Sequence, residues 1–192
     1  GVASVSSRQM AERFGLNSAQ VRKDLAYFGQ FGVRGLGYYI AELKHNLERI
    51  LGLQQDWEVA LVGVGNLGSA LIASKGFKAR GFKIGVAFDT DPAKVGQVVG
   101  GVQVVETANL VPTLRKKRVK IAVLAVPAPA AQSVADLLVE AGATAILNFA
   151  PAQITVPEGV KVQNVDLSVL LKTLSYHTVR TNRPSPRRLQ PR

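Results

Sequence analysis

The sequence contains no cysteine and only two histidines among its 192 residues. The lack of cysteine excludes disulfides, cysteine-ligated zinc and thiol chemistry, and it fits a reducing compartment. No apolar run approaches the roughly 20 residues of a membrane-spanning helix, and no basic and apolar leader opens the chain. These absences predict a soluble, cytoplasmic protein without a metal or membrane partner, in which any redox chemistry must go through a bound cofactor.

Acidic residues are also scarce. The chain has 24 Lys and Arg against 13 Asp and Glu, a formal net charge of +11, and such a surplus favours polyanions through counterion release. Nucleic acid is therefore the leading candidate partner. The last residues, 180–192, hold five arginines, three prolines and no acid, so this basic tail is expected to be disordered.

Two short helices are expected near the start of the chain. Ser6 and Gln9 have the spacing of a capping box, and Gly15 supplies a left-handed stop to the first helix. The second helix is expected to begin after the cap residue Asn17 and to end at Gly29. This arrangement is typical of a helix-turn-helix, and the alternative is an ordinary helical pair with a solvated charged face.

The second helix has a composition suited to DNA. Val21, Leu25 and Phe28 repeat at helical spacing and are expected to face inward, while Gln20 is placed to complete a second capping box. Its outward side chains can donate to guanine or pair with adenine, as those of a recognition helix do. The candidate DNA-binding residues of this helix are Ser18, Gln20, Arg22 and Lys23.

A glycine-rich segment between Phe31 and Ile40 predicts a β-hairpin with Arg34 near its tip. A helix-turn-helix followed by a hairpin is a winged helix, and an arginine at the tip suits a narrow, A·T-rich minor groove. Arg34, Gly35 and Tyr38 therefore join the candidate DNA-binding residues. In the alternative interpretation, the glycines serve only a tight turn and Tyr38 belongs to the core.

The middle of the chain carries a dinucleotide-binding pattern. A strand expected at 58–62 leads into a G-x-G-x-x-G sequence and then into a helix, which is the context of the Rossmann fingerprint. The glycines allow a tight turn, close approach of a pyrophosphate and packing of helix on strand, and the helix N-terminus offers N–H groups. The candidate cofactor-binding residues here are Gly63, Val64, Gly65, Asn66, Leu67 and Gly68.

A second strand, expected at 83–88, ends in Asp89, twenty-one residues after Gly68. An acid at this place binds the two hydroxyls of the adenosine ribose and disfavours a 2′-phosphate. We therefore expect NAD(H), not NADP(H), as the cofactor. Asp91 is the competing candidate, and its alternative role is to cap the turn that contains Pro92.

Further strands are expected at 121–126 and 145–147, with a helix at 131–141 between them. The alternation of strands and helices predicts a parallel, doubly wound sheet with its ligand at the carboxyl edge. The residues that follow these strands are expected to face the nicotinamide half of the cofactor, or else to form purely structural turns. They are Val126, Pro127, Asn148 and Phe149.

Residues for catalysis are missing from this pattern. A dehydrogenase needs an acid or base at the nicotinamide, yet His45 lies in a helix of the head and His177 lies near the tail. No tyrosine occurs between Tyr39 and Tyr176, so a Tyr–Lys pair inside the sheet domain is excluded as well. The sequence thus favours a sensor over an enzyme.

From about Ser6 to Tyr176 the sequence resembles Rex, the bacterial family of redox-sensing transcriptional repressors. The resemblance implies a homodimer that binds operator DNA, is released when NADH binds and tolerates NAD+. The matching strings are 18–25, 27–29, 34–35, 37–38, 63–68, 88–89, 125–127, 146–151 and 164–167.

The resemblance also implies a role for the last helix. Leu167, Leu170, Leu171 and Leu174 form an apolar stripe at i, i+3, i+4 and i+7, and in similar proteins this helix is exchanged between subunits. The alternative is a helix that packs on its own domain. Asp166 would then lie at a subunit junction near the nicotinamide, where it can report cofactor charge, or it serves as the helix N-cap.

Two features depart from the family pattern. The first helix of the family has no counterpart, because only residues 1–5 precede the first cap. Ser74 stands where a family member can have a tyrosine near the nicotinamide. Both departures predict weakened or altered sensing.

The predicted fold class is α/β. It comprises a winged-helix DNA-binding domain (1–55), a Rossmann-type doubly wound parallel sheet (56–165), a C-terminal dimerisation helix (166–179) and the basic tail (180–192). Two alternatives remain open. One is an NAD-dependent oxidoreductase with a basic docking head, and the other is a Rossmann domain for coenzyme A or another adenine ligand.

Overall fold

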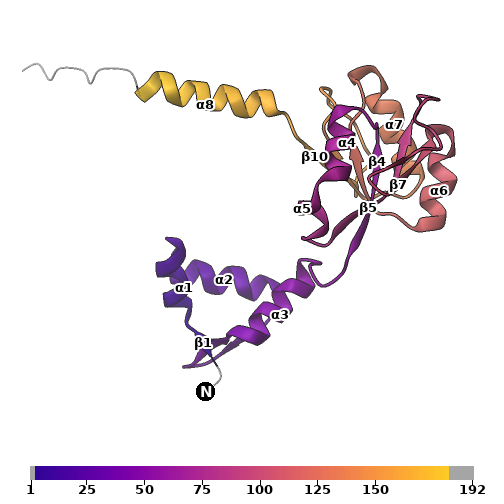
Figure 1. Ribbon diagram of the computed structural model, residues 1–192. Helices are drawn as coiled ribbons and strands as arrows, with labels where there is room; N and C mark the ends of the chain where they lie inside the picture. Colours follow the sequence, from indigo (N-terminus) through magenta and orange to yellow (C-terminus); the bar gives the residue numbers. More distant parts are fainter. Residues whose placement is uncertain (1–2, 182–192) are drawn as a thin grey trace, which may run out of the picture. The chain divides into compact units, whose positions relative to one another are not determined.

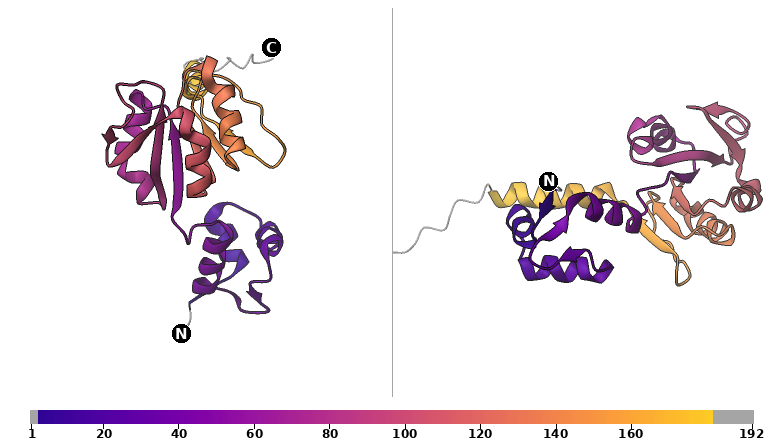
Figure 2. Two further views of the ribbon diagram at one scale, coloured as in Figure 1. Left: turned by 90° about the vertical axis from the view of Figure 1, so that its right-hand side faces the viewer. Right: turned by 90° about the horizontal axis from the view of Figure 1, so that it is seen from below.

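The computed structural model describes residues 3–181, which divide after Asp56 into two compact units. We call residues 3–56 the head and residues 57–181 the sensor unit (Figure 1, Figure 2). Within 3–181 no helix is long and apolar enough to cross a bilayer. Apart from its first two positions, which end the last helix, the predicted basic tail lies outside the described residues.

The head has the helices and the hairpin that the sequence predicts. Ser6 caps the first helix in a complete capping box, and Gly15 ends it at a φ of 65°. Asn17 caps the second helix, but the second capping box is absent because Gln20 donates to Asp24 one turn further on. The elements are β1 (Ser4–Val5), α1 (Ser7–Phe14), α2 (Ser18–Phe28), β2 (Gly32–Val33), β3 (Gly37–Tyr39) and α3 (Ile40–Ile50).

A third strand completes the sheet of the head, in the order β1-β3-β2. Sequence reasoning missed β1, which has only two residues and pairs antiparallel with β3 through Val5 and Tyr38. The core of the head consists of Ala11, Val21, Tyr38 and Leu43. The inward placement predicted for Phe28 is wrong for the head by itself, since 47% of this residue is exposed.

The sensor unit is built on a seven-stranded sheet in the order β10-β9-β8-β4-β5-β7-β6, and only the β6–β7 pair is antiparallel. Sequence reasoning missed three edge strands: β6 has only two residues, β7 alternates buried and less buried positions over five residues, and β10 is mostly exposed. The elements are β4 (Trp57–Val62), α4 (Asn66–Ala73), α5 (Lys75–Lys78), β5 (Phe82–Asp89), β6 (Val98–Val99), β7 (Val102–Glu106), η1 (Thr107–Asn109), α6 (Leu110–Lys117), β8 (Ile121–Leu124), α7 (Ala128–Glu140), β9 (Ala145–Asn148), β10 (Lys161–Asn164) and α8 (Leu167–Thr181).

Helices cover the two faces of this sheet unequally, as Figure 2 shows. On one face α6 and α7 bury a large core around Phe88, Leu114 and Leu138. Among the described residues, the other face has only α4, whose Leu71 and Ile72 pack against the cluster that contains Leu61 and Val104, and the four-residue α5. The strand order and the crossover between β7 and β8 are those of the doubly wound Rossmann fold, so the predicted α/β class is confirmed.

Candidate nucleotide and DNA sites

The glycine-rich loop joins β4 to α4 at the carboxyl edge of the sheet. Gly63 has a φ of 96°, and a Cβ there would collide with the carbonyl oxygen of Ala125. A Cβ on Gly68 would collide with the carbonyl oxygen of Gly63. The absence of a side chain at Gly68 therefore allows α4 to pack closely against the end of β4. Gly65 differs, because a Cβ there would meet no protein atom within 4 Å. The loop is thus packed tightly underneath and open at Gly65.

The open side of the loop is where α4 begins. Gly65 is the N-cap of this helix, and no side chain caps its first turn. The N–H groups of the first turn and the helix dipole therefore favour an anion, and the missing Cβ leaves room for it beside the backbone. A pyrophosphate fits this loop, as the sequence pattern predicts.

Asp89 ends β5 and is anchored beside the loop. Its Oδ2 accepts a hydrogen bond from the backbone N–H of Val64 at 2.8 Å, and its Oδ1 accepts one from the N–H of Asp91 at 2.9 Å. The ammonium group of Lys94 lies 3.3 Å from Oδ2. The carboxylate is therefore fixed at the end of β5 next to the glycine-rich loop.

Asp89 is also held in its ionised form. Partial burial acts to raise the pKa of Asp89, but hydrogen bonds from the N–H groups of Asp91 and Val64, and then Lys94, outweigh it and lower the pKa below the usual value. Each carboxylate oxygen can accept more than one hydrogen bond. The competing residue Asp91 instead caps its own turn, where its Oδ1 accepts from the N–H of Ala93 at 2.9 Å.

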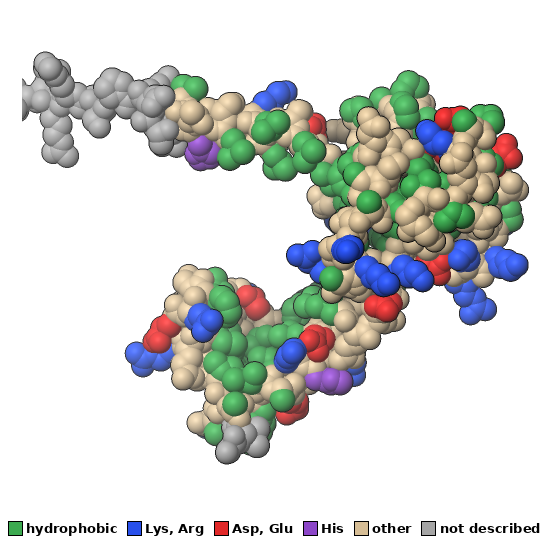
Figure 3. All heavy atoms as spheres, in the orientation of Figure 1, with side chains coloured by type: hydrophobic (Ala, Val, Ile, Leu, Met, Phe, Trp, Pro, Cys, Tyr) green, Lys and Arg blue, Asp and Glu red, His purple; other side chains and the backbone are tan. Residues whose placement is uncertain are grey.

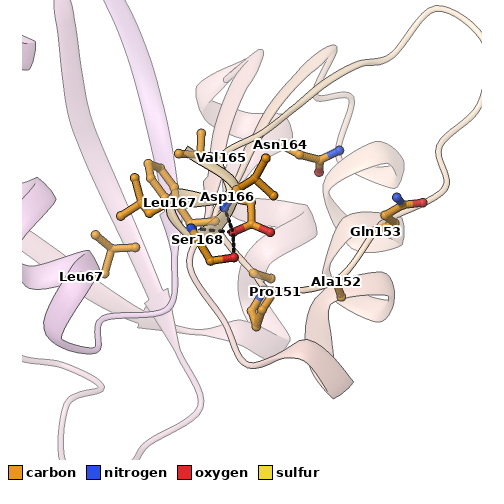
Figure 4. Close-up of a pocket in the computed structure, with 12 residues that line it drawn as sticks. Leu67, Pro151, Ala152, Gln153, Asn164, Val165, Asp166, Leu167 and Ser168 are labelled. Atoms are coloured by element: carbon orange, nitrogen blue, oxygen red, sulfur yellow. Dashed lines mark hydrogen bonds between the residues drawn. The ribbon is translucent and has the colours of Figure 1, made fainter. Parts of the chain in front are cut away.

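A cavity of about 560 Å³ opens further along the carboxyl edge (Figure 4). Leu67 of the loop lies on one side of it, and the segment after β9 and the start of α8 lie on the other. Phe149 and Asp166 of the predicted nicotinamide site line this cavity, together with Leu67 of the glycine-rich loop. Val126 and Pro127, which were predicted to join them, do not line it.

Asn148 does not present its side chain to this cavity. Its Nδ2 donates to the carbonyl of Ala152 and to Oδ1 of Asn164, at 2.8 and 2.9 Å, and its Oδ1 accepts from the N–H of Ala150. Only 1% of the residue is exposed. The predicted direct contact of this amide with the cofactor is therefore wrong for this structure, because burial commits the amide to shaping the turn after β9.

Asn148→Ala is expected to lower the free energy of unfolding by about 2 to 3 kcal/mol. The substitution leaves the N–H of Ala150 and two acceptors without their partner in a buried position. Urea unfolding followed by circular dichroism measures the change, with Gln153→Ala at the rim of the cavity as the control. A loss below about 0.5 kcal/mol, the size expected of an ordinary surface substitution, would contradict this role.

Asp166 caps α8 at the rim of the cavity. Its Oδ1 accepts from the N–H and the hydroxyl of Ser168, at 2.8 and 2.7 Å, and from the N–H of Val169 at 3.3 Å (Figure 4). The hydroxyl and N–H of Ser168 lower the pKa of Asp166 below its usual value, against the opposing effect of burial. Asp166 is thus the N-cap of α8, and its Oδ2 accepts none of these three hydrogen bonds.

The head brings part of its predicted DNA site together. Arg22 of α2 and Arg34 and Gly35 of the hairpin line one concavity of about 460 Å³, and Arg22 donates to Oγ of Ser7 at 3.1 Å. Gln20, Lys23 and Arg34 are exposed and Ser18 is half-buried. Tyr38 is 8% exposed and packs beneath Gly32, so its ring belongs to the core and is not a free DNA contact.

Comparison with known proteins assigns the chain. A curated protein of Desulfitobacterium hafniense, "Redox-sensing transcriptional repressor Rex", is 49% identical over 177 residues, which cover 92% of this chain and 84% of that protein. This chain belongs to the Rex family of redox-sensing transcriptional repressors. The Rex protein of Streptomyces coelicolor is 48% identical over 93% of this chain and 69% of its own length.

Solved Rex-family structures and family models agree with this assignment. The structure "RSP in complex with beta-NAD+ and operator DNA" has a TM-score of 0.84 at 37% identity, covering 93% of this chain and 82% of RSP. "RSP in complex with beta-NADH" has a TM-score of 0.75 at 35% identity, covering 92% and 82%. The model "CoA binding domain" matches residues 54–152, so the sensor unit belongs to that broader family too, and "Putative DNA-binding protein N-terminus" matches residues 1–26.

Proposed function

We propose that this protein holds operator DNA through its head and is released when NADH binds its sensor unit. The observation that carries the proposal is the glycine-rich loop beside the anchored carboxylate of Asp89, on the same chain as a winged-helix head. RSP, a Rex-family relative, has been solved with NAD+ and operator DNA and also with NADH. Both ligands of the proposal therefore have a precedent in a protein of the same fold.

The cofactor would lie across the carboxyl edge of the sheet. The pyrophosphate would lie over Gly65 and the N-terminus of α4, with Val64 and Asn66 contributing to the loop, and Asp89 would accept the ribose hydroxyls. The nicotinamide half would extend into the cavity lined by Leu67 and Phe149. Oxidised nicotinamide is cationic and reduced nicotinamide is neutral, so a carboxylate at the rim of the cavity, such as Asp166, distinguishes the two forms by charge.

The DNA contacts would come from the exposed face of α2 and from the tip of the hairpin. Arg22 and Lys23 can donate to guanine in the major groove, and Gln20 can pair with adenine. Ser18 lies at the start of α2, where a recognition helix meets the phosphates. Arg34, with Gly35 beside it, would enter the minor groove, where A·T-rich sequence strengthens the negative potential.

The protein would act as a homodimer through α8. Leu167, Leu170, Leu171 and Leu174 remain 59–66% exposed in the single chain, an apolar stripe that a second copy would cover. The thinly covered face of the sheet has a hollow of about 200 Å³ lined by apolar residues, among them Val59, Ile121 and Leu147. Exchange of α8 between two copies would bury both features.

The positions of the histidines and tyrosines favour a sensor over an oxidoreductase. His45 lies in α3 of the head, where Gln54 contacts its Nδ1, and His177 lies in α8. In residues 57–181 no tyrosine precedes Tyr176. No histidine or tyrosine of the described carboxyl edge is thus placed to exchange a proton with a substrate beside the nicotinamide.

NADH is expected to weaken binding to an A·T-flanked palindromic duplex by about 5- to 150-fold, the range of a coupling free energy of 1 to 3 kcal/mol. Fluorescence anisotropy of the labelled duplex measures this, with saturating NAD+ as the control that leaves binding in place. Because coupling is reciprocal, the duplex must weaken NADH binding by the same factor. Equal affinity for the duplex with NADH and with NAD+ would refute the proposal.

The ligand alternatives are separated on the same preparation. A ligand that binds the folded protein raises its melting temperature by an amount that grows with the logarithm of its affinity, so NADH, NADPH and coenzyme A at equal concentration can be ranked by thermal shift. Steady NADH absorbance in the presence of small carbonyl compounds is expected. A larger shift with coenzyme A than with NADH, or a loss of absorbance, would favour one of the two alternatives.

A further inference from the structure

Lysines and arginines gather along one margin of the sensor unit. Between Trp57 and Ser175 the chain has twelve of them, and nine fall in two segments, 75–83 and 115–120. Figure 3 shows this concentration as a blue band along the lower margin of the sensor unit. We call these nine residues, all of which are exposed, the basic edge: Lys75, Lys78, Arg80, Lys83, Arg115, Lys116, Lys117, Arg118 and Lys120.

The topology places both segments at the amino edge of the sheet, opposite the cofactor loop. The first segment contains α5 and runs into the start of β5, and the second ends α6 and runs into the start of β8. These two strands are the direct neighbours of β4 on its two sides. Since adjacent strands lie about 4.8 Å apart, the strands that receive the two segments are about 10 Å apart.

The basic edge carries far more positive than negative charge. Within residues 57–181, ion pairs involve only two of its members, Lys117 with Glu58 at 2.7 Å and Arg115 with Glu140 at 3.4 Å. The acids that end strands, Asp89 of β5 and Glu106 of β7, lie at the opposite edge. The sheet is therefore polarised, with its unneutralised cations at the amino edge.

The head is attached at this same edge. Residues 51–56 connect α3 to β4, and β4 starts at Trp57 between the two basic segments. Trp57 follows Ile50 by seven residues, and seven extended residues span at most about 25 Å. A connection of this length tethers the start of β4, and the two basic segments beside it, to the domain that is proposed to bind DNA.

We propose that the basic edge binds the phosphate backbone of the DNA that the head holds. This inference rests on the proposed operator binding and adds a sequence-independent contact from the sensor unit. DNA is the fitting partner because it offers a dense row of phosphates and because the proposed DNA-binding head is joined to this edge by the short connection 51–56. Binding there releases counterions, so the contribution is measurable as a steeper dependence of affinity on salt.

The test compares the full-length protein with the variant Lys78→Ala/Lys83→Ala/Lys116→Ala, whose three lysines are exposed and have no ion pair within residues 57–181. Fluorescence anisotropy is measured on an operator duplex of about 40 base pairs at several salt concentrations. Each phosphate contact adds about 0.9 to the slope of log affinity against log salt. We expect the slope of the variant to be shallower by two or more, and its affinity at physiological salt to fall 10- to 100-fold.

Matched variants complete the test. Lys78→Arg/Lys83→Arg/Lys116→Arg keeps the charge and is expected to keep the wild-type slope. Lys161→Ala removes one charge from β10, three strands away from β4, and is also expected to keep the wild-type slope. Operator preference over a scrambled duplex and release by NADH should persist in the alanine variant. Unchanged slopes with intact NADH release would overturn the role of the basic edge alone, and loss of NADH release from the wild type would overturn the proposed function instead.

Discussion

Leu170→Asp/Leu174→Asp is expected to convert the protein from a dimer to a monomer and to abolish tight operator binding. Both side chains lie on the apolar stripe of α8 and are 59% and 61% exposed in the single chain. A fully buried leucine contributes about 1.5 to 3 kcal/mol, and exchange of α8 would bury both leucines in each of two subunits. Substituting these four leucines therefore removes roughly 6 to 12 kcal/mol from the free energy of dimerisation, which raises the dissociation constant of the dimer by four or more orders of magnitude.

Sedimentation equilibrium measures the dimer, and anisotropy on the palindromic duplex measures its consequence. Operator binding falls with the dimer because two linked heads engage two half-sites, and a single head loses that effective concentration. Lys172→Gln/Tyr176→Asp is the control, since it makes the same change in net charge on the side of α8 opposite the stripe. Dimers that survive the leucine substitutions, or that dissociate equally in the control, would show that this stripe is not the interface.

The glycine-rich loop illustrates what sequence can predict. Gly63 and Gly68 are required by backbone contacts within a few residues of the loop or on the adjoining strand, and such contacts repeat wherever a strand, this pattern and a helix follow one another. The same holds for the capping box at Ser6 and for the left-handed stop at Gly15. Local geometry determined these features, so reading along the chain was sufficient.

Features that depend on distant partners could not be read in this way. Asn148 at a strand end was expected to meet the cofactor, but its amide is bonded to Asn164, sixteen residues away. Tyr38 follows a predicted hairpin tip, yet the strand at Val5 pairs with it and the small core of the head encloses its ring. The signal that could have corrected both is burial, which requires the tertiary arrangement.

The basic edge is a third case, between these two. Its charges are visible in the sequence as two short runs, but nothing local indicates that segments 75–83 and 115–120 lead into the two neighbours of one strand. The strand order supplies that information, because β4 stands between β5 and β8. The excess positive charge is spread along the sequence, and only the strand order shows that it is concentrated at one edge of the sheet.

The second large effect is expected from Asp89→Asn, which should raise the NADH concentration needed for release from the operator by about 100-fold. The carboxylate would accept the two ribose hydroxyls, and hydrogen bonds to a charged group contribute about 1.5 to 3 kcal/mol each. The amide also turns a donor toward Lys94 or toward one of the N–H groups that now bind Asp89. Operator binding without cofactor should be unchanged, because Asp89 ends β5 at the carboxyl edge of the sheet, opposite the basic edge and outside the head.

Isothermal titration with NADH and NADPH, beside anisotropy on the operator, measures this effect. The variant should bind NADH weakly and should lose most of its discrimination against NADPH, because the charge that repels a 2′-phosphate is gone. Asp91→Asn is the matched control, since it neutralises a carboxylate two residues away that caps its own turn. If Asp91→Asn weakens NADH binding and Asp89→Asn does not, the ribose belongs to Asp91. If neither does, the adenosine half lies elsewhere than at the end of β5.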